Sequence, residues 1–597
     1  MFNKKNLYIL LRSDMFLMLA LFIAAIFMRL YVLASLYPFR LSSDDAIYMS
    51  MARYIKEGQF SMALHPVWLP LFPFISAVFN FIIKDWALTG RMVSVVFGSL
   101  LVIPIYVIAR SAAGRKAGLL ACIFLIFFYP LLYVSSQSLS EALLAFLVWC
   151  GLALSLKNFK KNKMIYSLSI GLLWGLAALT KSEGFFVTIG FGIFSLLNVI
   201  CRFLLKINHK NFLFPILCIA LGIIITKTIA IYAIVSLVLA AYLLLGISFL
   251  KNIDVKKHII FRNFLFISIG FLLIYLPYNI ALTAKYNKQL FFAKSIAFKS
   301  YSGYFQMNAK KTSTWIQDVD SLETYSINPQ FSISLNEIVT KIPTLLRTGI
   351  YDNFTTLGKK IFSYNSTLEL ILFFTGFYWY ATSKKNYFNF FLISLILFLA
   401  FTIMTFFTSS LDLRYISWFI PIIPLGMSFG IIYLESILRN RKYRVFYLLL
   451  VFLLVIQYVL NNISVIWPSQ KNINIANILE LKLPSWQSPR IIYRNLYRNK
   501  YVNDFDIKLT ILLKNKRVMA RHEGFLFESK SLLIYSPDVL NLDELLTYAK
   551  KWKVDYIVGS QGEVADVLNF LYLQPKDYPG LKLMFFQNGL PPVYKLL

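Results

Sequence analysis

The sequence predicts a polytopic α-helical membrane protein with about 13 transmembrane helices and a small α/β domain at its C-terminal end. Three observations lead to this fold class. The 597 residues are 58% hydrophobic with a mean hydropathy of +0.64, which is too apolar for a soluble protein of this length. The apolar residues form blocks of about 20, the length that crosses a bilayer as a helix. Basic residues fill alternate loops between these blocks.

The candidate spans all lie within residues 1–467, which we assign to a transmembrane domain. They are 15–36, 91–110, 117–134, 138–156, 164–180, 185–201, 212–226, 228–250, 262–282, 366–382, 387–408, 414–436 and 445–467. The stretch 212–250 is also long enough to be one helix, but a single span there would move the basic loops at 384–385 and 439–444 to the outside, so we predict a hairpin at Thr226–Thr228.

Every predicted inner loop carries Lys, Arg or both, whereas the short outer turns contain only Lys181, Lys227 and Arg414 as basic residues. Because cytoplasmic loops are enriched in basic residues, we expect a multi-pass protein of the plasma (inner) membrane with a cytoplasmic N-terminus. Three larger segments then lie outside: the loop 37–90, the loop 283–365, to which we assign no role, and the tail 468–597.

The tail has the pattern of a small extracytoplasmic α/β domain. Residues 517–520, 532–535 and 556–559 are short apolar runs typical of strands, and residues 543–552 have the pattern of a helix.

Other functional classes are excluded by composition and motifs. The net charge of +32 is not a sign of nucleic-acid binding, because most of the excess lies in predicted cytoplasmic loops, where it meets lipid headgroups. The four cysteines all fall in predicted spans, so they suggest neither a disulfide framework nor a zinc site. No glycine-rich nucleotide-binding motif is present.

The first outer loop holds two adjacent acids, Asp44 and Asp45. Ser42 is a suitable N-cap and Gly58 a suitable stop, so a helix is expected between them, with an apolar stripe of Ile47, Met51 and Ile55 suited to the membrane face. Neighbours on a helix point about 100° apart, so one acid can do chemistry while the other supports the turn. The competing interpretation is that both acids only complement the helix N-terminus.

Further polar residues fall at the outer ends of other spans, which favours one outward-facing polar cavity. They are His65, Arg91, Glu141, Lys181, Glu183, Arg414 and Tyr415. A lone His beside a proline is more often a loop contact than a catalyst, and the cations could simply extend to the interface at span ends. Arg29 lies inside the first span and is expected to have a structural partner.

These residues, in this order, resemble the GT-C class of polytopic glycosyltransferases, in the branch of the dolichyl-phosphate-mannose–protein mannosyltransferases and lipid A aminoarabinose transferases. The resemblance is carried by Asp44-Asp45 with Tyr48, His65-Pro66, Arg91 with Ser94, Ser140-Glu141, Leu179–Gly184, Arg414-Tyr415 and a tail segment around Met519 and Tyr556. It leaves 283–365 unaccounted for. Where the family often has Asp-Glu, this chain has Asp44-Asp45.

The resemblance implies transfer of a sugar from a polyprenyl-phosphate donor to a glycan, lipid or protein acceptor at the outer face. Asp44 would be the general base and Asp45 its support. Arg414, Lys181 and Arg91 are the candidates for the donor phosphate, and Tyr48, His65, Glu141, Glu183 and Tyr415 for the substrate pocket. No cofactor or metal is expected, the alternative being a divalent cation on Glu141, Glu183 and Asp44.

Two other functions remain open at this stage. A lipid-linked oligosaccharide transferase or polymerase would use similar residues. A transporter or flippase of lipid-linked sugars would also have many spans, although such proteins tend to contain paired half-repeats, and none is evident here.

Overall fold

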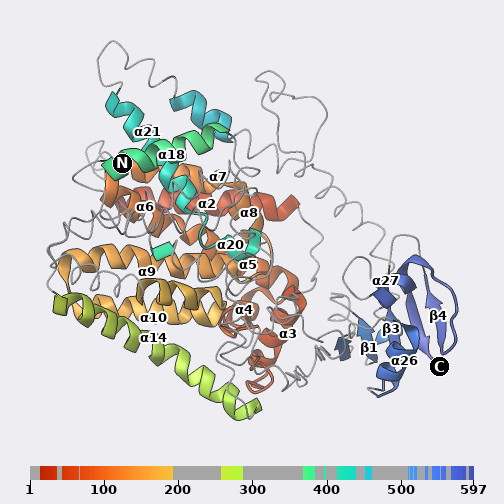
Figure 1. The fold of residues 1–597 in the computed structure, drawn as a ribbon. Helices are drawn as coiled ribbons and strands as arrows, with labels where there is room; N and C mark the ends of the chain where they lie inside the picture. Colours follow the sequence, from red (N-terminus) through yellow and green to blue (C-terminus); the bar gives the residue numbers. More distant parts are fainter. Residues whose placement is uncertain are drawn as a thin grey trace, which may run out of the picture.

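The fold was analysed in a computed structural model that describes residues 14–35, 44–65, 68–192, 257–286, 367–382, 396–397, 413–437, 449, 451–459, 509, 511–514, 516–520, 532–535, 541–551, 553–559, 566–586 and 591–597. The N-terminal part is helical (Figure 1). Its helices are α2 (Asp14–Ser35), α3 (Asp44–Lys56), α4 (Leu71–Ile83), α5 (Trp86–Leu100), α6 (Val102–Ala113), α7 (Arg115–Phe127), α8 (Tyr129–Ser135), α9 (Glu141–Lys161), α10 (Met164–Thr180), α14 (Lys257–Tyr286), α18 (Thr367–Thr382), α20 (Leu413–Ile416) and α21 (Ile422–Ile437).

Within these described ranges, 4 helices are long and apolar enough to cross a membrane: Asp14–Ala34, Trp86–Ala113, Glu141–Asn158 and Arg262–Lys285. A fifth crossing is α7 with α8 if this bent pair is counted as one span; its axis turns by 59° at the start of α8, where Pro130 lies in the first turn. Shorter apolar helices match the predicted spans at 164–180 and 414–436. Several predicted spans, including 212–226 and 228–250, lie outside the described residues, so thirteen remains a prediction.

Contacts between loops agree with the predicted alternation of sides. At the end predicted to be cytoplasmic, Asp14 at the start of α2 forms ion pairs with Arg110 at the end of α6 and Arg115 at the start of α7. Arg262 near the start of α14 donates to the side chain of Asn162, which ends α9, at 2.7 Å. Residues predicted on one side of the membrane therefore meet at one end of the bundle.

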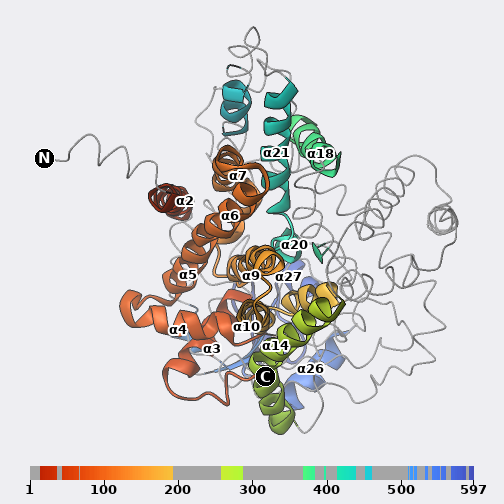
Figure 2. The ribbon, with the colours of Figure 1, turned by 90° about the vertical axis from the view of Figure 1, so that its left-hand side faces the viewer.

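The opposite end shows the same agreement. Lys285, in the last turn of α14, donates to the carbonyls of Ser61 and Leu64 in the first outer loop. Helices α9, α10 and α14 run side by side, as Figures 1 and 2 both show. The C-terminal end of α14 therefore lies beside the predicted first outer loop.

In the described residues of the predicted outer loop 37–90, α3 and α4 precede the start of α5, whereas the sequence predicted one helix there. α3 spans the predicted residues and ends before Gly58, which has a φ of +79°; Ser42, the predicted N-cap, lies outside the described residues. The prediction that the apolar stripe of α3 lies along the membrane is wrong. Ile47 and Met51 are buried in the protein core. α4 was not predicted, since Pro70 and Pro73 resemble a loop, yet proline is tolerated in a first helical turn.

The C-terminal residues form a five-stranded sheet in the order β2-β1-β3-β5-β4. Strands β1 (Arg517–Ala520), β2 (Leu532–Tyr535) and β3 (Tyr556–Val558) and helix α26 (Leu542–Lys551) confirm the predicted elements. Helix α27 (Asp566–Leu573) and the antiparallel strands β4 (Leu581–Phe585) and β5 (Val593–Leu596) were not predicted. On one face of the sheet, Met519, Ile557 and Tyr594 pack against α26 and α27. On the other face, Val518 and Val558 belong to a second apolar cluster.

Close packing of α10 on α14 depends on glycine, as is common between transmembrane helices. A Cβ atom on Gly171 would lie 2.1 Å from the carbonyl oxygen of Ile267, so the backbones could not approach this closely. Gly192 differs, because a Cβ atom there would meet only the ring of Phe264, at 3.1 Å.

We predict that Gly171→Ala lowers the free energy of unfolding by about 1–3 kcal/mol, the usual cost of overpacking. Gly192→Ala is the matched control and should be neutral or slightly stabilising, since alanine favours helices and the Phe264 ring can shift. Denaturation in detergent measures both variants. Equal stability of the two would contradict the role given to Gly171.

Candidate active site

The two adjacent acids occupy different environments. Asp44 begins α3, is only partly buried, and accepts a hydrogen bond from the indole Nε1 of Trp68 at 3.2 Å. Asp45 is 4% exposed and its carboxylate lies 3.9 Å from Nη2 of Arg91. The predicted divergence of neighbouring side chains on a helix is therefore present, with one acid accessible and the other held inside the protein.

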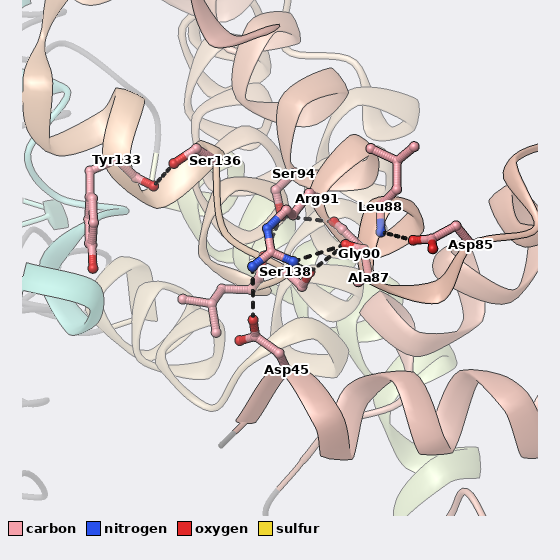
Figure 3. A network of polar contacts seen from close by, with 11 residues as sticks. Asp45, Asp85, Ala87, Leu88, Gly90, Arg91, Ser94, Tyr133, Ser136 and Ser138 are labelled. Atoms are coloured by element: carbon pink, nitrogen blue, oxygen red, sulfur yellow. Dashed lines mark hydrogen bonds and ion pairs between the residues drawn. The ribbon is translucent and has the colours of Figure 1, made fainter. Parts of the chain in front are cut away.

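Arg91 lies deeper than the sequence indicated. The predicted span began at Arg91, but α5 begins five residues earlier, because Asp85 caps it by accepting a hydrogen bond from the backbone N–H of Leu88 at 2.6 Å. Arg91 is thus more than one turn inside the helix and buried. Its guanidinium donates to the carbonyl of Ala87 at 3.1 Å and to the hydroxyl of Ser138 at 3.4 Å (Figure 3).

The segment between α8 and α9 closes against this pair. Ser94 donates to the carbonyl of Leu139 at 2.8 Å, and Ser138 donates to the carbonyl of Ala87. Gly90 permits the approach, since a Cβ atom there would lie 2.8 Å from that of Ser138. Arg91 therefore joins α3, α5 and the start of α9, as seen in Figure 3.

A second charged cluster lies at the ends of α9 and α10. The ammonium of Lys181 is 2.8 Å from Oε1 of Glu141 and 3.4 Å from Oε1 of Glu183, and all three side chains are at most 5% exposed. The ring of Tyr415, in α20, lies 4.5 Å from the same ammonium. The structure thus brings together four of the predicted site residues. The side chain of Arg414 lies outside the described residues.

Tyr48 connects the two acidic regions. Its hydroxyl is 3.1 Å from the hydroxyl of Ser140, and its ring packs edge-on against Phe72. Burial raises the pKa of the Tyr48 phenol, the negative charges of Glu141 and Asp44 raise it further, and Lys181 opposes them. Tyr48 therefore remains a neutral hydrogen-bonding group between these charges.

His65 acts as the loop contact that its sequence context favoured. It is buried, its Nδ1 accepts the backbone N–H of Trp68 at 3.2 Å, and its carbonyl accepts the hydroxyl of Tyr278 at 2.6 Å. His65 therefore fixes the tryptophan that holds Asp44. Sequence reasoning missed Trp68 and Tyr278, although a buried indole or phenol ordinarily requires a hydrogen-bond partner.

Two further predictions concern Arg29 and metal binding. Arg29 is fully buried and donates to the carbonyl of Ala25 one turn earlier, at 3.2 Å, the hydrogen bond it makes within the described part of the chain. No group of three or more His, Cys, Asp or Glu side chains suited to a metal occurs among the described residues. Glu141 and Glu183 instead share Lys181.

Removing one partner of a buried ion pair leaves the other charge uncompensated, which typically costs about 3–5 kcal/mol. Because the Asp45–Arg91 separation is 3.9 Å, we expect Asp45→Ala to lower the free energy of unfolding by about 3 kcal/mol, the low end of that range. The measurement is denaturation in detergent.

The control is Asp85→Ser, which exchanges one good helix cap for another and should change stability by only a few tenths of a kcal/mol. Adding Arg91→Met to Asp45→Ala removes the stranded charge and should recover at least half of the loss. Failure of the second substitution to recover stability would mean that Asp45 stabilises the fold by another contact.

Comparison with known proteins gives a family match for part of the chain. Residues 64–225 match the family described as dolichyl-phosphate-mannose-protein mannosyltransferase. No curated protein sequence matches. Asp44 and Asp45 precede the matched range, whereas His65, Arg91, Glu141, Lys181 and Glu183 fall within it.

A search of solved structures gives matches that include the following two. ArnT from Cupriavidus metallidurans bound to undecaprenyl phosphate has 13% identity and a TM-score of 0.49, over 96% of this chain and 97% of that one. The archaeal oligosaccharyltransferase AglB from Archaeoglobus fulgidus, in complex with an inhibitory peptide and a dolichol-phosphate, has 13% identity and a TM-score of 0.45, over 91% and 69%. The family match confirms, for residues 64–225, the predicted resemblance to the GT-C class of polytopic glycosyltransferases.

Proposed function

We propose that this protein is a membrane glycosyltransferase that moves a monosaccharide from a polyprenyl-phosphate-linked donor to an acceptor hydroxyl at the outer face of the plasma membrane. The observation that carries the proposal is the separation of the two adjacent acids. Asp44 is accessible and held by a neutral donor, Trp68, whereas Asp45 is buried against Arg91. The family match over 64–225 supports the same reaction class.

In the proposed reaction, Asp44 accepts the proton of the acceptor hydroxyl as that oxygen attacks the anomeric carbon. The bond between this carbon and the phosphate oxygen breaks, and the lipid phosphate leaves with the electron pair. A direct displacement of this kind inverts the configuration at the anomeric carbon. General-base catalysis by a positioned carboxylate accounts for the attack, and cations facing the phosphate favour its departure.

The three candidate cations for the donor phosphate differ in how far carboxylates already compensate their charge. Arg91 and Lys181 are each buried against carboxylates, so their charge is already compensated. We therefore assign the donor phosphate first to Arg414, which precedes Tyr415 and is thus close in sequence to the Lys181 cluster.

We predict that Asp44→Asn lowers the rate of sugar transfer by about 10²–10⁴-fold, the usual contribution of a general base. The assay follows radiolabelled hexose from polyprenyl-phosphate hexose donors into an acceptor in purified membranes. Asp85→Asn, an exposed acid on the next helix cap, is the control and should retain the parent rate. Transfer by Asp44→Asn at the parent rate would disprove the assigned base.

The products separate this function from its rivals. Mass spectrometry of the acceptor should show the addition of one sugar unit, whereas an oligosaccharide transferase would add a block. Accumulation of the lipid-linked sugar across sealed vesicles without a covalent product would identify a transporter and overturn the proposal.

A further inference from the structure

Glu141 is the incomplete member of the Lys181 cluster. Its Oε1 is paired with Lys181, whereas its Oε2 is buried without a hydrogen-bond partner among the described residues. Glu183 differs, because its Oε1 also faces Lys181 while its Oε2 accepts the hydroxyl of Ser182 at 3.1 Å. A buried carboxylate oxygen without a partner is costly, so Glu141 lacks one hydrogen-bond donor.

The charge of the cluster indicates what that donor can be. Two carboxylates share one ammonium, so the three side chains together carry an excess negative charge when all are ionised. Such a cluster repels a phosphate, and Lys181 has no role there as a phosphate ligand. It attracts a hydroxyl group, which donates a hydrogen bond to a carboxylate.

The surroundings of Glu141 suit a sugar ring. Tyr48 is bonded to Ser140, the residue before Glu141, and Tyr415 lies against Lys181, so two aromatic residues border the cluster. Tyr48 lies about one turn after Asp44 in α3, so its hydrogen bond with Ser140 brings the cluster near the proposed base. The Tyr48 and Ser140 hydroxyls and the second carboxylate oxygen of Glu141 are polar groups that can exchange hydrogen bonds with the hydroxyls of a sugar.

On the basis of the proposed function, we infer that Glu141 binds a hydroxyl group of the donor sugar through Oε2, and that Lys181 is the counter-ion that holds this carboxylate and not a ligand of the donor phosphate. Glu141 is then a specificity-determining residue, and Lys181 a positioning residue. The inference separates recognition of the sugar from recognition of its lipid phosphate, so the two can be measured independently.

The experiment compares two ligands. Undecaprenyl phosphate without a sugar reports on the phosphate site through its Kd, and undecaprenyl-phosphate hexoses report on the sugar site through their KM. Glu141→Gln should raise the KM of the best hexose donor by about 10- to 100-fold, as expected for loss of a hydrogen bond to a charged group. Its Kd for bare undecaprenyl phosphate should equal that of the parent.

Three further variants test the assignment. Glu183→Gln removes the same charge but no vacant acceptor, so its KM should rise less than that of Glu141→Gln. Lys181→Met should leave the Kd for bare undecaprenyl phosphate unchanged, and its loss of transfer should be partly recovered by adding Glu183→Gln, which restores the balance of charge. The control for the substitution itself is Glu435→Gln, because Glu435 is an ion-paired glutamate near the end of α21, away from the cluster. Its KM and its Kd should equal those of the parent.

The contrary outcomes are distinct. Loss of undecaprenyl phosphate binding in Lys181→Met would make Lys181 a phosphate ligand, and equal KM shifts in the two Gln variants would reduce the cluster to a charge effect. A KM shift that appears only with added Mg²⁺ or Mn²⁺ would make Glu141 a cation ligand. Each of these overturns the inference while leaving the proposed function intact. Absence of undecaprenyl phosphate binding and of transfer from every polyprenyl-phosphate hexose and pentose donor in the parent would instead contradict the proposed function.

Discussion

Pairing of buried charges is the interaction on which one end of this helical bundle depends, the end that the sequence predicts to face outward. A charge in a low-dielectric interior is tolerated when an opposite charge and hydrogen bonds compensate it. Asp45 with Arg91, and Glu141 and Glu183 with Lys181, meet this requirement with residues from α3, α5, the start of α9 and the turn after α10. Four segments that are separate in sequence are thereby held in one place.

This pairing also decides which residues remain available for chemistry. Asp45 and Asp44 are neighbours, yet only Asp45 is directed to Arg91. The cost of leaving Arg91 without a counter-ion fixes the rotation of α3 about its axis. With that rotation fixed, Asp44 faces Trp68 and remains partly exposed. The buried acid thus positions the accessible one without contacting any substrate.

The sequence alone predicted which ends of the helices meet, because hydropathy and basic loops define the side of the membrane on which each loop lies. It placed Lys181 and Glu141 at the same end, and they are in contact. It could not predict that they are each other's partners. Two residues at helix ends can face a cavity, the lipid or one another, and only the packing of α9 on α10 decides between these directions.

The spacing of apolar residues in α3 likewise could not predict what its apolar face packs against. Apolar residues four positions apart define one face of a helix, but they do not distinguish lipid from protein as its partner. Ile47 and Met51 are buried in the core, while Phe81 and Ile82 of α4 are exposed apolar residues in the same loop. The strands of the tail were easier to predict, since short apolar runs flanked by polar residues have few alternatives in a segment without long apolar blocks.

The partner of Asp44 explains why an acid at this position can act as a base. The indole N–H of Trp68 donates to Oδ1 of Asp44 and so orients the carboxylate. Trp68 is itself fixed through His65 by Tyr278 of α14. Arg91 and Lys181 are paired with Asp45, Glu141 and Glu183, so these ion pairs stabilise the fold around the proposed base.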